Sequence, residues 1–231
     1  MKKITLIIIA SLFFKFECSA QKYFALPPGY NKIITSENRP QLDGSPYLES
    51  NWDEGSIVMN SGDTIPIILL RYNFYSGEMT YKHKQVVYSI GAPEKIKSIT
   101  IGSLKFIYLA YKDDNEQLKK NFFELVYPGK IKLLTLYYPS VLPSNYNPTM
   151  AVGNKNDQLV VKEQYYVQVN DSNIIAIDKK GDSYINALGE LGPKIKDYVK
   201  QNRLSFNNKG DLMTITFYAN TLIKWVTTTL M

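Results

Sequence analysis

Between Gly55 and about Tyr138 the chain alternates short apolar runs with turn residues, and this pattern constrains the fold more than any other feature. The runs are rich in Val, Ile, Tyr and Phe, the residues that a pleated and half-buried surface favours. Segments such as "NSGD", "GS" and "PGK" join them and are typical of tight turns. Residues 55–180 are therefore predicted to form an antiparallel β-meander, closed as a sandwich, roll or partial barrel. Pro66 lies inside one run and predicts an edge strand or a bulge there.

After residue 181 the apolar spacing changes from a strand period to a helix period. A first stripe is Tyr184, Ile185, Leu188 and Leu191, and a later one is Leu212, Ile215, Ala219, Leu222 and Val226. Residues 181–231 are therefore predicted to form about three α-helices, separated at "GP" and at "NNKGD". The later stripe is apolar enough to need a partner surface, so this helical appendage is expected to pack on the β-domain. The fold class is predicted to be α+β.

The first 20 residues, "MKKITLIIIASLFFKFECSA", have the pattern of a secretory signal. Two lysines precede an apolar run that is shorter than the roughly 20 residues a membrane-spanning helix needs. Small residues then precede a predicted cleavage after Ala20. A buried N-terminal strand or helix is the competing interpretation. Cys18 is either removed with the signal or is the site of a lipid anchor, and the residues around it fit a lipid anchor poorly.

Residues 21–54 are predicted to form an irregular leader that packs in part through Trp52, because Pro, Gly, Asn and Ser are frequent there. Cleavage at Ala20 would leave a chain without Cys, so its core must stabilise it without disulfides. The formal net charge of +6 is well mixed along the sequence and includes three lysines of the signal. Nucleic acid is therefore not an expected partner, whereas weak attraction to an anionic membrane surface stays open.

The order of several motifs is familiar. "GSPYL" precedes "NSGDT", followed by "LLRYNFYSGEMTYK", "PEKIKSITIG", "FFELVYPGKIKLL" and "LGPKIKDYVKQNRLSFNNKGDLMTITFYAN". From about Gly44 to Asn220 the chain resembles an uncharacterised family of secreted proteins from Gram-negative bacteria. The resemblance implies export and a β-then-α layout, and it brings no catalytic residues with it. The Thr-rich ending "WVTTTLM" departs from the usual tail of that family.

Residue types exclude several kinds of chemistry. His83 is the single His, and with no Cys after the signal a structural zinc site is not expected. The acidic run "DDNE" at 113–116 lacks the alternating ligands and Gly of a calcium loop. Neither a nucleophile elbow nor a nucleotide-binding glycine loop occurs. We therefore expect no metal and no cofactor, while a carboxylate pair that meets only in the fold stays open.

The stretch "LLRYNFYSGEMTYKHK", from Leu69 to Lys84, is the candidate binding region. One interpretation is a concave face where Arg71, Tyr81 and the nearby Tyr88 meet a glycan or peptide. The other is ordinary sheet packing, because strand residues alternate faces and cross-strand aromatic pairs stabilise hairpins by a few tenths to about 1 kcal/mol. His83 is predicted to be a solvent-exposed turn residue.

The function expected from these observations is non-enzymatic. The chain is predicted to be an accessory, binding or structural protein of the periplasm or outer surface, without a transmembrane span after cleavage. Its partner would be an envelope glycan, a peptide or a protein. The alternative is a hydrolase that acts on envelope glycan or peptide with two carboxylates in a cleft.

Overall fold

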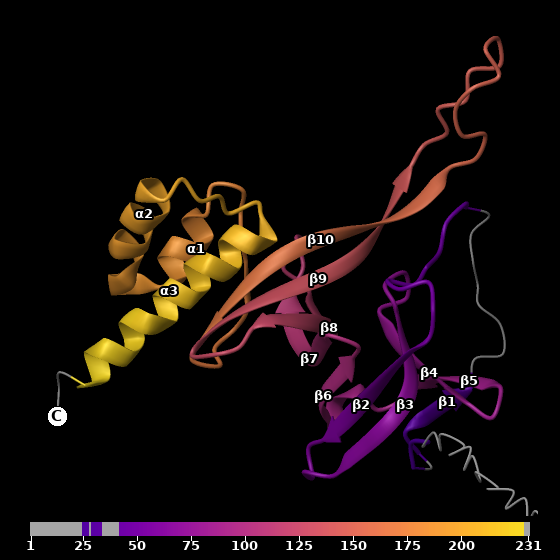
Figure 1. The fold of residues 1–231 in the computed structure, drawn as a ribbon, viewed down its shortest axis with the longest axis horizontal. Helices are drawn as coiled ribbons and strands as arrows, with labels where there is room; N and C mark the ends of the chain where they lie inside the picture. Colours follow the sequence, from indigo (N-terminus) through magenta and orange to yellow (C-terminus); the bar gives the residue numbers. More distant parts are fainter. Residues whose placement is uncertain (1–24, 28, 34–41, 229–231) are drawn as a thin grey trace, which may run out of the picture.

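The computed structural model describes residues 25–27, 29–33 and 42–228, which form one eleven-stranded sheet with three helices at one end (Figure 1). The strands are β1 (Asn31–Ile33), β2 (Asp53–Met59), β3 (Thr64–Asn73), β4 (Glu78–His83), β5 (Val86–Ile90), β6 (Ile96–Ile101), β7 (Leu104–Lys112), β8 (Leu118–Tyr127), β9 (Ile131–Leu142), β10 (Gln158–Val169) and β11 (Ile175–Ala176). The helices are α1 (Asp182–Ala187), α2 (Gly192–Gln201) and α3 (Lys209–Thr228), with 3-10 turns η1 (Pro93–Lys95) and η2 (Gly189–Leu191). The predicted α+β class, rich in antiparallel strands, is confirmed.

Several predictions fall on residues that the structure does not describe. The signal at 1–20, its cleavage after Ala20 and the fate of Cys18 lie outside the described residues. The leader at 21–54 is described in part, and it is less irregular than expected because it contains β1 and isolated bridges at Asp43 and Tyr47. Among the described residues, none of the helices combines the length and the apolar character needed to cross a bilayer.

The hairpins form where the turn chemistry predicts them. Gly62, between β2 and β3, has φ of 96°, and Gly102, between β6 and β7, has φ of 53°. These left-handed conformations strain residues with a Cβ, so glycine suits both turns. The register of β2 and β3 shifts opposite Pro66, and β4 pairs with β3 only from Leu69 onward. The predicted bulge or edge position of Pro66 is thereby confirmed.

The sheet is not one continuous meander. The strand order is β1-β5-β4-β3-β2-β6-β7-β8-β9-β10-β11, so β6 pairs with β2 instead of with β5. The chain passes from β5 through η1 to reach the far side of β2. Two meanders, β2 to β5 and β6 to β11, therefore run in opposite directions from a shared centre.

The N-terminal half of the sheet curls into a roll. The Tyr72 hydroxyl of β3 donates a hydrogen bond to Asn121 of β8 at 3.2 Å. In the sheet order β2, β6 and β7 lie between these two strands, so the sheet must curl to bring them together. The Tyr72 ring also lies 6.4 Å from the ring of Tyr137 on β9. The enclosed core contains the buried side chains Ile57, Ile68, Leu70, Tyr72, Met79, Tyr81, Ile99, Phe106 and Phe122.

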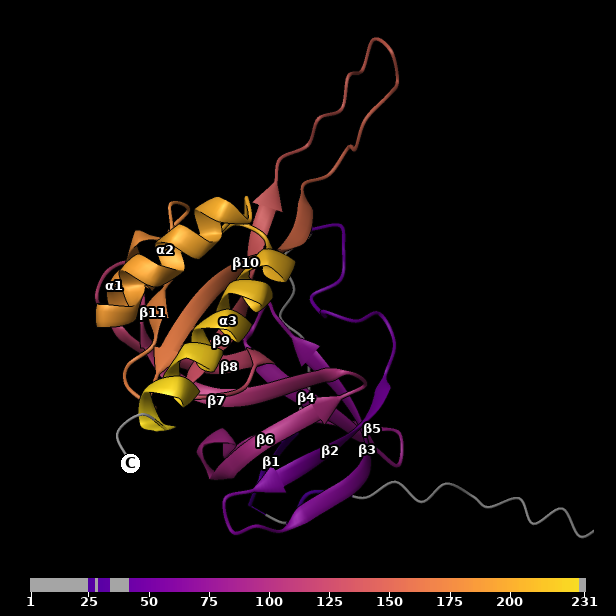
Figure 2. The ribbon, with the colours of Figure 1, turned by 60° about the vertical axis from the view of Figure 1, so that its left-hand side comes forward.

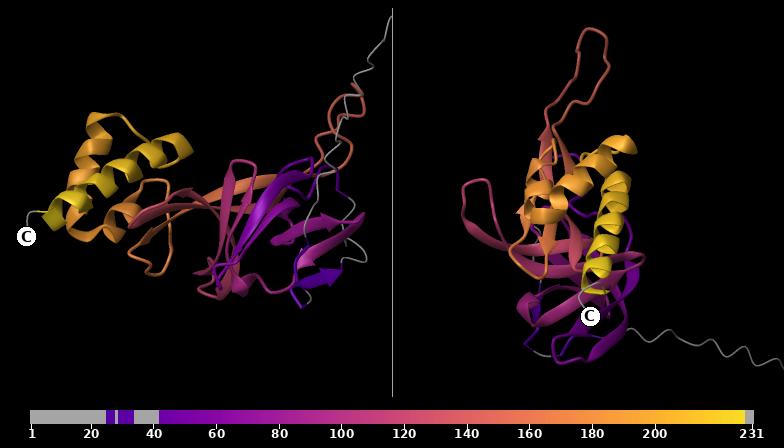
Figure 3. Two further views of the ribbon diagram at one scale, coloured as in Figure 1. Left: turned by 60° about the horizontal axis from the view of Figure 1, so that its bottom comes forward. Right: turned by 90° about the vertical axis from the view of Figure 1, so that its left-hand side faces the viewer.

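The helices cover the other end of β9 and β10. Figures 2 and 3 show α3 along these strands, with α1 and α2 beside it and the roll at the opposite end of the molecule. A second core joins the sheet to the helices through Ile131, Leu133, Val167, Tyr184, Ile195, Leu212, Ile215 and Ala219. The predicted stripe of α3 is thus buried at three of its positions, while the side chain of Val226 lies outside the described part.

Strands β9 and β10 are the longest, with 12 residues each, and they carry a loop away from the body. Residues 143–157, which we call the projecting loop, extend beyond both the roll and the helices (Figure 1). Met150 and Val152 in this loop are exposed. The sheet therefore supports two appendages, one packed and one projecting.

Candidate functional site

The structure places the three sequence-predicted residues on two faces of the sheet. Tyr81 is fully buried in the roll, where its ring stacks on Tyr88 with centroids 5.1 Å apart. Its hydroxyl donates to Asn31 of β1 at 2.7 Å, and burial raises the pKa of Tyr81 to about 12. Arg71 lies on the opposite face, because its register partner is Thr80 and strand residues alternate. Tyr81 and Tyr88 therefore meet, but Arg71 does not join them.

Arg71 has aromatic neighbours of its own. Its guanidinium carbon lies 3.2 Å from the centroid of the Tyr47 ring and 4.4 Å from that of Trp52. Such cation–π contacts are worth about 0.5–2 kcal/mol. Both rings come from the leader, so Arg71 holds the leader on the roll. This is a packing role, and it also shows how Trp52 contacts the body.

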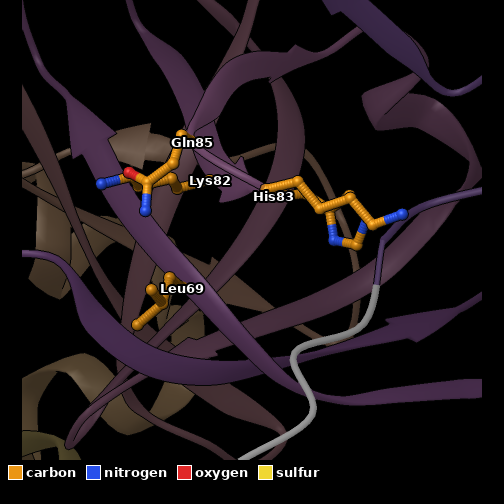
Figure 4. A pocket seen from close by; sticks show the side chains of 5 residues that line it. Leu69, Lys82, His83 and Gln85 are labelled. Atoms are coloured by element: carbon orange, nitrogen blue, oxygen red, sulfur yellow. The ribbon is translucent and has the colours of Figure 1, made fainter.

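His83 is the last residue of β4 and is half-buried, so it is not the solvent-exposed turn residue that the sequence predicts. It lines a hollow of about 350 Å³ with Leu69, Lys82, Lys84 and Gln85. Figure 4 shows the His83 side chain directed away from those of Lys82 and Gln85. Because its polar groups diverge, this hollow offers no set of convergent partners for one ligand.

A better-organised hollow of about 230 Å³ lies on the outer face of β9 and β10, and we call it the tyrosine pocket. Its lining consists of Tyr111, Asp113, Asp114, Leu136, Tyr138, Gln164 and Tyr166. The pocket exists because the ladder between β8 and β9 begins only at Glu124, so β8 diverges from β9 before that residue. The loop after β7 then lies against β9 and β10.

Aromatic rings form the walls and floor of the tyrosine pocket. The rings of Tyr111 and Tyr166 are 6.0 Å apart at 80°, and each makes a similar edge contact with the fully buried Phe123 beneath them. This packing fixes two ring orientations before any ligand arrives. Tyr138 is 38% exposed and supplies a ring face that is open to solvent.

Apart from the tyrosine hydroxyls, the polar groups of the tyrosine pocket act as hydrogen-bond acceptors. The Gln164 amide nitrogen donates to the carbonyls of Tyr165 at 3.0 Å and Ile177 at 2.9 Å. Since these bonds occupy both amide hydrogens, Gln164 can offer a ligand only its oxygen. Burial, and then the neighbouring Tyr111, raise the pKa of Tyr166, so its hydroxyl stays protonated at neutral pH.

The charges around the tyrosine pocket are balanced. Asp113 forms an ion pair with Lys119 at 2.7 Å, and its other oxygen accepts the backbone N–H groups of Asn115 and Gln117. The bond from Lys119, followed by that from Gln117, lowers the pKa of Asp113. Asp114 is exposed, and Lys162 is the register partner of Tyr138 on the same face. Two carboxylates are thus offset by two ammonium groups.

The described residues contain no group of three or more His, Cys, Asp or Glu side chains that could hold a metal ion. The lining of the tyrosine pocket can provide stacking, van der Waals contact, and hydrogen bonding both to acceptors, through the tyrosine hydroxyls, and to donors.

Sequence reasoning missed the tyrosine pocket because its residues come from β7, β9, β10 and a loop. No local motif connects Tyr111, Tyr138 and Tyr166. Only the pairing of β9 with β10 could have indicated the pocket from the sequence. This pairing places Leu136 opposite Gln164 and so brings Tyr138 and Tyr166 onto the same face.

Comparison with known proteins matches no family model, no curated protein and no solved structure. The resemblance to secreted proteins of Gram-negative bacteria therefore stays a prediction.

Proposed function

We propose that the protein is a non-enzymatic binding protein and that the tyrosine pocket holds its ligand. The observation that carries this proposal is the group of three tyrosine rings around a hollow of about 230 Å³, two of them fixed at right angles by a buried Phe123. Ligand sites typically combine aromatic walls with a few placed polar groups. Two further hollows in the described part of the chain are less suitable, because one is basic with divergent side chains and the other, lined in part by Arg71, holds a volume of only about 10 Å³.

The ligand class that fits this pocket is a saccharide. A sugar ring has apolar C–H faces that pack on aromatic rings, and its hydroxyl groups donate to acceptors such as the Gln164 oxygen and the Asp114 carboxylate. The balanced charge around the pocket favours a neutral ligand over an anion or a cation. An envelope glycan is the source that agrees with the sequence analysis.

A binding role is supported over hydrolysis by the state of Asp113. A glycosidase needs one protonated carboxyl group and one carboxylate flanking the scissile bond. The hydrogen bonds that lower the pKa of Asp113 keep it ionised and hold both of its oxygens. It is therefore poorly suited as a general acid, and the neighbouring Asp114 is exposed.

Export to the periplasm or outer surface is part of the proposal. It is supported by the charged start and the short apolar run before Ala20. Sequencing of the mature protein from its N-terminus should begin at Gln21, and a lipid-modified Cys18 found by mass spectrometry would contradict cleavage at Ala20.

The binding proposal is tested by replacing the exposed ring. Calorimetric titration with soluble disaccharides and envelope-derived oligosaccharides should find a ligand for the unmodified protein. Tyr138→Ala should then weaken binding about two- to tenfold, because it removes one aromatic contact surface. Tyr75→Ala is the matched control, since Tyr75 is also 38% exposed but lies in the β3–β4 turn.

Two results would contradict this proposal. One is the absence of saccharide binding, and the other is an equal effect of Tyr75→Ala and Tyr138→Ala. Release of new reducing ends from an oligosaccharide, abolished by Asp114→Asn, would instead support the hydrolase alternative.

A further inference from the structure

One edge of the sheet is open over a short stretch of β10. On its outer side, β11 pairs only with Tyr166 and Val167, and at the other end Asp43 bridges to Gln158. Among the described residues, none pairs with the outer side of residues 160–164, which we call the β10 window. Figure 1 shows β10 at the margin of the sheet between the helices and the projecting loop.

Hydrogen bonds at both ends identify the backbone groups that point out of the window. The Leu159 N–H donates to Asp43 at 2.7 Å, and the Tyr165 carbonyl accepts from Ile177 at 2.8 Å. Because outward groups alternate along a strand, Val161 and Glu163 also direct their N–H and C=O groups outward. The window thus offers two donors and two acceptors over about 17 Å.

The opposite edge of this hairpin is closed to strand pairing. In β9 the residues that bond to β10 are the even-numbered ones, so Pro139 directs its backbone nitrogen away from β10. Proline has no N–H to donate, and it commonly protects sheet edges. The β10 window lacks such protection, since Val160 and Val161 have high β-propensity and a full set of backbone groups.

We propose that the β10 window accepts an extended peptide segment of a partner protein as an added antiparallel strand. This mode uses main-chain hydrogen bonds for affinity and alternate side chains for specificity. Lys162 lies between Val161 and Glu163, the two residues whose backbone groups point outward. The partner residue opposite Lys162 should therefore be acidic. The side chain of Val161 is 40% exposed and favours an apolar residue opposite it.

A second copy of this chain fits the window poorly. Two copies could bond through all four backbone groups in one antiparallel register. In that register Val161 of one copy pairs with Glu163 of the other, and Lys162 lies at the centre. This register would therefore place Lys162 directly opposite the second copy's Lys162. Like charges directly opposite each other destabilise a ladder, and edge lysines are a known protection against self-association. The same charge attracts an acidic partner strand.

Amide exchange measured by NMR tests the proposal on the intact mature chain. In the free protein, the amides of Val161 and Glu163 should exchange quickly, whereas those of Lys162 and Gln164, which bond to β9, should be protected. The probe is the acetylated pentapeptide Thr-Lys-Glu-Val-Thr at millimolar concentration. It places glutamate opposite Lys162 and valine opposite Val161 in an antiparallel ladder. Exchange at Val161 and Glu163 should then slow at least severalfold.

One modified peptide and three protein variants separate the contribution of the backbone from that of the charge. The same peptide, N-methylated at the residues that face Val161 and Glu163, should give no protection because its donors are gone. Lys162→Glu should weaken the unmodified peptide roughly tenfold. Val161→Pro should abolish binding, and Val161→Thr should keep it, which separates a lost N–H from a lost side chain.

Three outcomes would overturn the proposal. They are protection of Val161 and Glu163 in the dilute free protein, equal binding of the N-methylated peptide, and absence of any protection by the unmodified peptide. Protection that grows with protein concentration alone would assign the window to a second copy and would also refute a partner peptide. The test uses no saccharide, so its outcome does not depend on saccharide binding.

Discussion

At the scale of single residues, the buried carboxylate of Glu124 depends on two neighbouring side chains for its hydrogen bonds. It is buried on β8, where it accepts a hydrogen bond from the Tyr137 hydroxyl at 2.6 Å. Lys209, the first residue of α3, bonds to both carboxylate oxygens at 2.7 and 3.0 Å. Burial, and then the bond to Glu124, raise the pKa of Tyr137, so it remains a donor. These three residues join the roll to the start of the last helix.

Removing Lys209 should destabilise the protein more than removing an ordinary surface lysine. Lys209→Met leaves a buried carboxylate short of its main partner, and an unsatisfied buried group costs about 1–3 kcal/mol or more when it is charged. Urea denaturation should show this loss, while Lys196→Met on the exposed side of α2 should stay within about 0.5 kcal/mol of the unmodified protein. Glu124→Gln combined with Lys209→Met should recover part of the loss. An additive double variant would show that the two residues are not coupled.

At the scale of elements, the start of α1 is stabilised by residues that the apolar spacing of the helix does not indicate. Gly181 precedes α1 with φ of 79°, and a Cβ there would lie 2.1 Å from the Phe206 ring. Asp178 satisfies the first turn, because its carboxylate accepts the N–H groups of Asp182 and Ser183 at 3.3 and 2.6 Å, and it also accepts that of Lys180 at 2.8 Å. The Asp178 N–H donates in return to the Ser183 hydroxyl at 2.9 Å.

This cap predicts a specific pH dependence. The hydrogen bonds from Ser183, and then those from Lys180 and Asp182, hold the pKa of Asp178 far below its usual range. A carboxyl group with a lowered folded-state pKa stabilises the fold fully above its unfolded pKa of about 3.9, and this stabilisation is lost as pH falls toward the folded value. Asp178→Asn should therefore lower the melting temperature at neutral pH, with a difference that shrinks below about pH 4. Asp197→Asn on α2 is the control, and a constant difference at all pH values would contradict the titration of Asp178.

The hairpins and the pocket differ in how far sequence alone could predict them. The turns at Gly62 and Gly102 are local, so a few residues determine which strands pair. The return of β6 to β2 depends on pairing between strands whose sequence neighbours lie elsewhere, and no short motif records it. The tyrosine pocket adds the divergence of β8 from β9, which arises from packing of the whole sheet. For the same reason the sequence alone leaves open whether Tyr81 lies on a binding face or in the sheet packing, and the structure buries it in the roll.

At the scale of the whole molecule, the two appendages of β9 and β10 have opposite relations to the core. The helices bury Ile131, Leu133 and Val167 of the sheet and so complete the second core. The projecting loop instead contains mostly exposed residues, and its side-chain hydrogen bonds are largely internal, such as that from the Asn154 N–H to Asn145. Asp43 of the leader contacts this loop twice, because its N–H donates to the Asp157 carbonyl and its carboxylate accepts from the Asn156 amide. The loop should therefore be separable, and the helices should not.

Two shortened chains test this difference. In the first, Asn-Gly replaces residues 143–157. Leu142 and Gln158 are register partners, so a two-residue hairpin turn fits between them. Its free energy of unfolding should fall by only about 1–2 kcal/mol, since the backbone bond from Asp43 to Asp157 and the exposed bond from Asn156 to the Asp43 carboxylate are lost.

The second chain ends at Lys180 and exposes three fully buried side chains of β9 and β10. Losing the burial of one such residue costs about 1.5–3 kcal/mol, so three are comparable with the whole stability of a typical domain. This chain should fail to melt cooperatively or should aggregate, whereas the loop-deleted chain should melt cooperatively and keep its saccharide and pentapeptide binding. If the chain ending at Lys180 melts like the full mature protein, the helices are an independent unit, and the interface on β9 and β10 contributes no stability.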